Sequence, residues 1–149
     1  MTFHITSGLE DKEYLKFLNE YYKKSKEENN TMWIVKPGEM SNRGCGIQVC
    51  KDIQDVKKII KNKKSHANGK SFSYIIQEYL REPFLYQNRK FDIRHYMMIN
   101  SSFGRIKGYW YEDGYIRTTS YKYSTKNNDP SVHLTNDAVQ KYCKDYGKY

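Results

Sequence analysis

The chain has 149 residues, of which 38% are hydrophobic and 15% aromatic, and this content predicts one folded core and argues against disorder. Its formal net charge of +9 indicates an acidic partner: nucleic acid, an anionic membrane, an acidic protein segment or a nucleotide. Because no apolar run reaches the length of a signal peptide or a membrane span, we expect a soluble cytoplasmic protein with no membrane partner.

The first half of the chain reads as helix, strand, strand and helix. Residues 10–27 place apolar side chains at helical spacing and predict an amphipathic helix. Its expected face comprises Tyr14, Leu18, Tyr21 and Tyr22, with Leu15 and Phe17 beside them. The β-rich runs at residues 32–36 and 46–50 predict two strands, so that residues 37–45 would connect a hairpin.

A second helix is expected from the capping residue Asp52 onwards, over residues 52–64. Its apolar stripe comprises Ile53, Val56, Ile59 and Ile60. Seven lysines against two aspartates lie between residues 51 and 70. They indicate either a solvated face or an electropositive landing surface, and the pattern leaves both interpretations open.

The second half of the chain is β-rich. Aromatic and β-branched runs are separated by turn residues, and they predict four strands of an antiparallel meander. The runs cover residues 72–80, 89–100, 104–114 and 115–121. Beyond them, Asn136 is a plausible N-cap for a helix that continues to the end of the chain.

Lys36 stands where the first strand ends, and a stretch containing Gly38, Gly44 and Gly46 follows it. A loop with free backbone N–H groups beside a lysine can hold phosphate. The same residues would equally serve an ordinary hairpin turn without a ligand. The loop matches neither a P-loop nor a dinucleotide-binding turn.

Strand alternation places Lys90, Asp92 and Arg94 on one face of the run at residues 89–98, together with Tyr96 and Met98. Such a face either meets water or holds a polyphosphate ligand. The second alternative is possible because a guanidinium group can donate two hydrogen bonds to phosphate oxygens. Arg117, His133, Thr135 and Asn136 add polar groups in the segments that follow. No catalytic triad is visible, and three cysteines with four scattered histidines match neither a disulfide framework nor a zinc site.

Four blocks, in order, resemble the signature segments of the tubulin tyrosine ligase and tubulin tyrosine ligase-like family. They read "WIVKPGEMSNRGCGI", "YIIQEYLREPFLYQNRKFDIRHYMMI", "GYIRTTSYKY" and "HLTNDAVQK". The resemblance extends from about Trp33 to Gln140. It implies an α+β fold of ATP-grasp type, an antiparallel sheet with flanking helices, of which residues 1–149 would be an incomplete part.

The resemblance also implies an ATP site. The matching positions are Lys36, Gly44, Gly46, Gln77, Glu78, Tyr79, Lys90, Asp92, Thr135 and Asn136. Lys36 and the glycine loop would meet the phosphates, and backbone groups of residues 77–79 would border the adenine. Arg94 and Arg117 match catalytic arginines near the terminal phosphate and the reacting carboxylate.

The activity implied is that of an ATP-dependent ligase. A carboxylate on an acidic tubulin tail, or on another acidic protein, attacks the γ-phosphate of ATP, and the amine of free glutamate or glycine displaces phosphate from the acyl phosphate. The family's magnesium ligands follow the last block, beyond Tyr149, and its amino-terminal domain is also missing, so we expect no metal site and no activity in this chain alone.

The alternative is a non-catalytic module that binds nucleotide or acidic tails. Nucleic acid is the weakest candidate partner, because no aromatic and basic fingerprint of an RNA-binding sheet occurs. By resemblance, the place of action would be the cytoplasm and its cytoskeleton, including the cilium or basal body.

Overall fold

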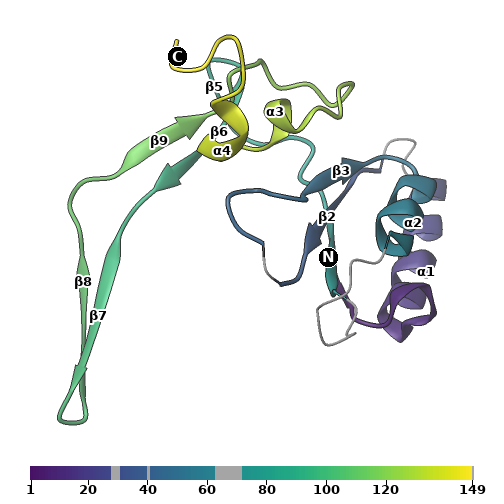
Figure 1. Cartoon of the computed structure of the whole chain (residues 1–149), viewed down its shortest axis with the longest axis horizontal. Coiled ribbons are helices and arrows are strands. Elements are labelled where there is room, and N and C mark those ends of the chain that lie inside the picture. Colours follow the sequence, from purple (N-terminus) through teal and green to yellow (C-terminus); the bar gives the residue numbers. More distant parts are fainter. Residues whose placement is uncertain (28–30, 40, 63–71, 149) are drawn as a thin grey trace.

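The computed structural model describes residues 1–27, 31–39, 41–62 and 72–148. These residues form a four-stranded sheet covered by two helices, and a smaller three-stranded sheet from which a long hairpin projects (Figure 1). The expected α+β class and antiparallel pairing are therefore confirmed.

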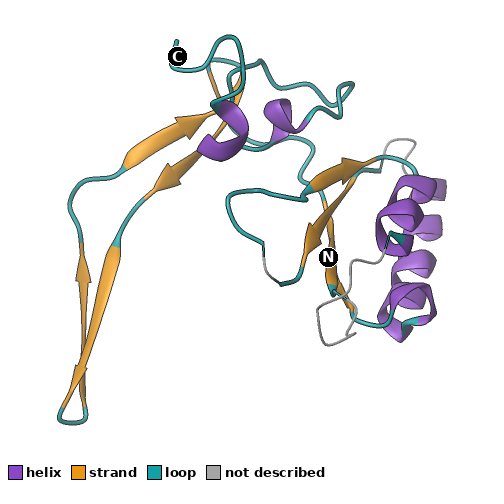
Figure 2. Cartoon of the chain, in the orientation of Figure 1, coloured by secondary structure: helices purple, strands orange, loops and turns teal. Residues whose placement is uncertain are grey.

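The first sheet has the strand order β1-β4-β2-β3, and all its neighbouring strands are antiparallel. Its strands are β1 (Thr2–Ile5), β4 (Tyr74–Glu78), β2 (Trp33–Pro37) and β3 (Gln48–Cys50). A 3₁₀ turn, η1 (Gly8–Glu10), leads into α1 (Lys12–Glu27), and α2 (Ile53–Lys61) follows β3. Both helices lie on the same face of this sheet (Figure 2).

The covered face carries the main core. Trp33 and Val35 point toward the helices, whereas Ile34 points to the opposite face. Phe17 of α1 is fully buried, and its ring meets Trp33 edge-on with 5.0 Å between the centroids. The helix prediction was right, but Phe17 rather than Tyr22 is central, since the Tyr22 side chain is 51% exposed.

Helix α2 forms as its sequence predicts. The Asp52 carboxylate accepts a hydrogen bond of 2.7 Å from the backbone N–H of Gln54 and so caps the first turn. The side chains of Ile53, Val56 and Ile60 are buried in the main core. The predicted continuation at residues 63–64, and lysines 63, 64 and 70, lie outside the described residues.

The predicted four-strand meander is wrong. Strand β4 belongs to the first sheet, and the run at residues 89–100 is interrupted at His95 and Tyr96. The resulting strands are β5 (Leu85–Tyr86), β6 (Arg89–Arg94), β7 (Met97–Ser102), β8 (Arg105–Trp110) and β9 (Tyr115–Thr118). Strand β6 pairs with β5 and β9, and β7 pairs with β8, so these segments form one bent hairpin.

The β7–β8 arm is exposed along its whole length and points away from the rest of the chain (Figure 1). Its tip is a two-residue loop in which Phe103 and Gly104 both have positive φ, 50° and 73°. This conformation matches the twist of the strands that it joins.

The C-terminal segment adds two short helices, α3 (Pro130–His133) and α4 (Asp137–Gln140). The expected helix to the chain end is therefore wrong, because α4 stops at Gln140. The Gln140 amide is buried, where it accepts from the Ser120 N–H and donates to the carbonyls of Ser131 and Leu134. Leu134 in turn packs with Ile34 and Tyr79 in a second core cluster, which joins the first sheet to the C-terminal segment.

None of the helices that the structure describes is long and apolar enough to cross a membrane.

Candidate functional site

Lys36 and Gln77 lie on the sheet face opposite the helices. The register aligns Ile34 with Gln77 and Lys36 with Ile75, so the Lys36 and Gln77 side chains are diagonal neighbours across β2 and β4. The Lys36 ammonium donates a 2.7 Å hydrogen bond to the Gln77 side-chain oxygen. This pair occupies the surface just before the glycine loop begins.

Glu78, one residue further along β4, points to the other face. Its carboxylate pairs with the Lys24 ammonium of α1 and lies 3.6 Å from the terminal amine of Met1. The backbone N–H groups of Glu78 and Tyr79 donate to the carbonyls of Met1 and Met32, each at 2.9 Å. Within the segment whose backbone groups are expected to border an adenine, the N–H groups of Glu78 and Tyr79 are thus already bonded, and the Glu78 side chain is outside the site.

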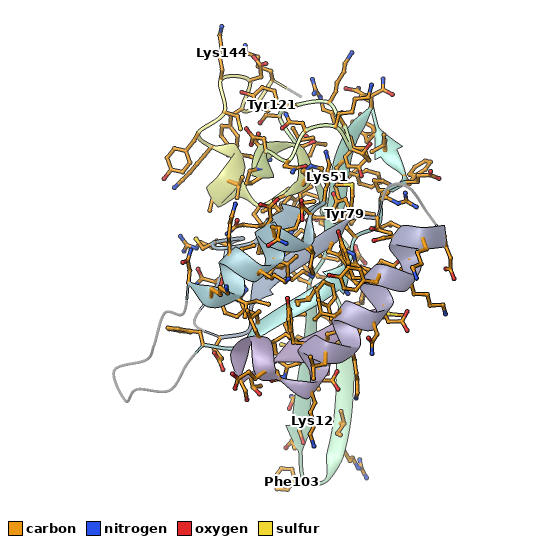
Figure 3. All side chains as sticks on the ribbon, turned by 90° about the vertical axis from the view of Figure 1, so that its right-hand side faces the viewer. Lys12, Lys51, Tyr79, Phe103, Tyr121 and Lys144 are labelled. Carbon is orange, nitrogen blue, oxygen red and sulfur yellow. The ribbon has the colours of Figure 1, made fainter. Side chains whose placement is uncertain are left out.

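Tyr79 brings the second sheet to this face. Figure 3 shows it near the centre of the molecule, and its side chain is only 6% exposed. The Lys90 ammonium on β6 donates a 2.8 Å hydrogen bond to the Tyr79 hydroxyl and lies 4.4 Å from the centroid of its ring. Burial lowers the pKa of Lys90 to about 8, and the nearby charge of Lys36 contributes to this shift.

Asp92 and Arg117 face each other across β6 and β9. The Arg117 guanidinium donates two hydrogen bonds of 2.7 Å to the Asp92 carboxylate, and the Thr135 hydroxyl donates a third of 2.6 Å. Burial alone would raise the pKa of Asp92, but these hydrogen bonds and the guanidinium charges hold it below its ordinary value. The carboxylate is therefore ionised and occupied by protein donors.

Arg94 lies on the same strand face, toward the hairpin arm. Its side chain is exposed, and its guanidinium lies 5.1 Å from the centroid of the Tyr96 ring. Its charge is near enough to contribute to the lowered pKa of Asp92. Arg94 is thus a predicted site residue whose side chain the structure leaves open to solvent and to a ligand.

The loop between β2 and β3 reaches back toward the second sheet. Gly44 has φ of +84°, and a Cβ atom there would lie 2.8 Å from the Asn136 side-chain oxygen. Gly46 has φ of +75°, and a Cβ atom there would lie 2.8 Å from Pro37. Both positions therefore require glycine. The loop lies against the segment that carries Thr135 and Asn136.

Two hollows border this group of residues without containing all of it. One, of about 830 Å³, lies between the glycine loop and α2 and is lined by Pro37, Cys45 and Lys58 among others. Another, of about 360 Å³, is bordered by Arg117, Thr135 and α4. Lys36 and Lys90 line neither hollow, so their proximity, not a closed cavity, defines the candidate site.

The sequence did not reveal the role of two buried side chains, Tyr79 and His133. The Tyr79 hydroxyl is 2.8 Å from Nδ1 of His133, and no spacing along the chain links these residues. In the part of the chain that the structure describes, no group of three or more His, Cys, Asp or Glu residues is placed to hold a metal ion.

Residues 7–149 match the model of the Tubulin-tyrosine ligase family. Tubulin glycylase 3B of Drosophila melanogaster is 34% identical over 116 residues, which cover 78% of this chain and 14% of that protein. Tubulin monoglycylase TTLL3 of Homo sapiens is 34% identical over 117 residues, which cover 78% and 14%. Probable tubulin polyglutamylase ttll-9 of Caenorhabditis elegans is 33% identical over 135 residues, which cover 90% and 31%. The chain thus spans less than a third of these relatives.

Proposed function

The chain belongs to the tubulin-tyrosine ligase family and has its α+β, ATP-grasp-type fold, and from this we propose that it forms part of the ATP site of a ligase that modifies tubulin tails. The relatives' names include glycylases and polyglutamylases, and the chain covers only a minor part of each of them. We accordingly propose that residues 1–149 are a part of an ATP-grasp domain within a longer enzyme.

The observation that carries this proposal is the proximity of Lys36 and Lys90. They come from different sheets, yet their ammonium groups donate to Gln77 and Tyr79, which are only two residues apart in the chain, and the charge on Lys36 contributes to the lowered pKa of Lys90. Each ammonium group donates a hydrogen bond to a neutral group: Lys36 to the Gln77 amide oxygen and Lys90 to the Tyr79 hydroxyl. Two neighbouring cations without a described carboxylate partner favour a polyanion, and a nucleotide polyphosphate is such a ligand.

We assign the ligand's phosphates to Lys36, Lys90 and the loop with Gly44 and Gly46. Asn136, against which this loop packs, would hold the loop over the phosphates. Gln77 and the backbone of residues 77–79 would border the adenine. Because Glu78 pairs with Lys24, only its backbone is assigned to the site.

Arg94 and Arg117 would stabilise the charge on the phosphoryl group during transfer. Both carboxylate oxygens of Asp92 accept hydrogen bonds from Arg117, and Thr135 donates a third, so we assign Asp92 to holding the guanidinium in place. In the reaction proposed, an acceptor carboxylate attacks the γ-phosphorus and ADP leaves. The amine of glutamate or glycine then attacks the acyl carbon, phosphate leaves, and an amide bond forms.

Among the described residues, no group of three or more His, Cys, Asp or Glu side chains is placed to bind magnesium, so the reaction proposed assigns no residue to that ion. The alternative that we propose for the chain taken alone is a module that binds nucleotide or acidic tails without turnover. The acidic partner proposed in either case is a tubulin tail, which would place the protein on the microtubule cytoskeleton, including that of cilia.

Nucleotide binding by the purified chain tests the proposal. We expect ATP to bind weakly, and Lys36→Ala and Lys90→Ala each to weaken binding further, while Lys61→Ala on α2 serves as the matched lysine control. Unchanged affinity in both site variants would contradict the proposal. Incorporation of labelled glutamate or glycine into tubulin, with a full-length relative as positive control, is expected to be absent for the chain alone.

A further inference from the structure

We propose that Tyr79 and His133 are positioning residues that hold the Lys90 ammonium in place through a directed chain of hydrogen bonds. This inference rests on the proposed nucleotide site, because it concerns how Lys90 is presented to the phosphates. It gives a role to the side chains of Tyr79 and His133, which act on the phosphates only through Lys90, and it makes a neutral His133 a condition for binding.

The direction of each hydrogen bond follows from chemistry. Nε2 of His133 lies 2.5 Å from the carbonyl oxygen of Asn127, which only accepts, so Nε2 carries the ring hydrogen. In a neutral imidazole Nδ1 then accepts, and the Tyr79 hydroxyl at 2.8 Å donates to it. The Lys90 ammonium can only donate, so it donates to the Tyr79 oxygen at 2.8 Å.

The packing around this chain of bonds leaves little room for rearrangement. The His133 side chain is 1% exposed, and the Tyr79 ring meets its ring edge-on with 5.3 Å between centroids. The Tyr123 ring packs against His133 at 5.7 Å, and its hydroxyl donates to the Arg81 carbonyl. Asp129 caps the short helix that carries His133. Lys90 is therefore held from a rigid, buried side.

Protonation of His133 would disrupt this arrangement. The charged groups that act on the ring are Lys90 on β6, Lys51 after β3, and Asp129 at the start of α3, while Tyr79 and Tyr123 face it as neutral groups. Burial, with the two lysines, lowers the pKa of His133 below its ordinary value, against the opposing effect of the Asn127 carbonyl and Asp129. A second proton would turn Nδ1 into a donor, so that it no longer accepts from the Tyr79 hydroxyl, and would add positive charge near Lys90.

The first test measures the affinity of the chain for ATP in Tyr79→Phe, with Tyr14→Phe as the matched control. Tyr14 is also buried, and its hydroxyl has no hydrogen-bond partner among the described residues. We expect Tyr79→Phe to weaken ATP binding about tenfold and Tyr14→Phe to leave it unchanged. Circular dichroism and thermal unfolding verify that each variant is folded.

Lys90→Ala separates the two hypotheses. If Lys90→Ala weakens ATP binding and Tyr79→Phe does not, the positioning chain is wrong and the nucleotide site stands. If Lys90→Ala itself has no effect, the nucleotide site is wrong and the inference fails with it.

A second test uses His133 and pH. The side-chain oxygen of His133→Asn can accept from Tyr79 but does not titrate, whereas His133→Phe offers no acceptor. We expect His133→Phe to lose affinity about as much as Tyr79→Phe, and His133→Asn to retain most of it with a flatter pH profile between about 5 and 7. Equal affinities and equal pH profiles in both His133 variants would overturn the proposal.

A third readout needs no ligand. The ¹⁵N chemical shifts of the His133 ring report its tautomer. We expect the tautomer in which Nε2 carries the hydrogen and Nδ1 carries none. The pKa of the Lys90 ammonium, followed by NMR, should fall in Tyr79→Phe and stay unchanged in Tyr14→Phe, because an acceptor for the charged form is lost. The opposite tautomer, or an unmoved pKa in both variants, would overturn the positioning chain.

Discussion

The Arg117 guanidinium on β9 donates two hydrogen bonds of 2.7 Å to the Asp92 carboxylate on β6. The pair is directly aligned in the strand register, and Thr135 from the C-terminal segment donates a third bond to the same carboxylate. One acidic side chain thus ties together three segments that are far apart in the sequence, and it fixes the orientation of an arginine proposed to contact the ligand.

Asp92→Asn should destabilise the chain by about 1 kcal/mol, because the pair is partly exposed and solvent screens it. The lowered pKa of Asp92 means that its contribution to stability is present above its unfolded value, near 4, and is lost as pH falls through its folded value. The variant should therefore differ from the unchanged chain at neutral pH and approach it in acid. Urea unfolding at several pH values measures this, and equal stability at neutral pH would contradict it.

Gly44→Ala should loosen the contact between the glycine loop and Asn136. The added Cβ atom would lie 2.8 Å from the Asn136 oxygen, in a backbone conformation that strains any L side chain. Gly104→Ala is the matched control, since Gly104 has a similar positive φ but no atom within 4 Å of the added carbon. We expect Gly44→Ala to lower both thermal stability and ATP affinity, and Gly104→Ala to lower stability alone.

The double variant Gly44→Ala with Asn136→Ala separates the steric clash from backbone strain. It should recover part of the stability lost in Gly44→Ala, because the clashing oxygen is removed. If the double variant is no more stable than expected from adding the two single effects, Gly44 does not pack against Asn136.

The β7–β8 arm should cause self-association. It is a two-stranded hairpin with an exposed apolar surface, and within the described residues no further strand pairs with its edges. Phe103 lies at its tip, far from Tyr79 (Figure 3). Ile106→Lys with Trp110→Lys should reduce association in sedimentation velocity, whereas Leu15→Lys, at an exposed apolar position on α1, should not. Equal association in all of these chains would exclude the arm as its cause.

Reversing the charge of Lys57, Lys58 and Lys61 on α2 should leave stability within about 0.5 kcal/mol of the unchanged chain, because we interpret them as a solvated face. Binding of a glutamate-rich peptide should then equal that of a Lys23→Glu, Lys26→Glu variant of α1. A loss of peptide binding confined to the α2 variant, and steeply dependent on salt, would instead identify α2 as a docking surface for acidic tails.

The sequence determined those features whose causes lie within a few neighbouring residues. Helix α2 is predicted by the Asp52 cap and by the helical spacing of Ile53, Val56 and Ile60, and both signals lie within about nine neighbouring residues of the sequence. Short β-rich runs predict strands β2 and β3. Between them, Gly44 and Gly46 allow the positive φ that the connecting loop adopts. The four family blocks also identified the family, which the match over residues 7–149 confirms.

Only the tertiary structure decided which strands pair and which side chains meet. A β-rich run specifies an extended segment but not its partner, so nothing local places β4 in the first sheet or pairs β6 with β9 rather than with β8. The same pairing decides that Asp92 is held by Arg117, that Glu78 turns toward α1, and that Tyr79 joins Lys90 to His133. These contacts depend on which segments pair and in which register, across separations of 11 to 54 residues, and local sequence patterns do not specify the partner of a strand.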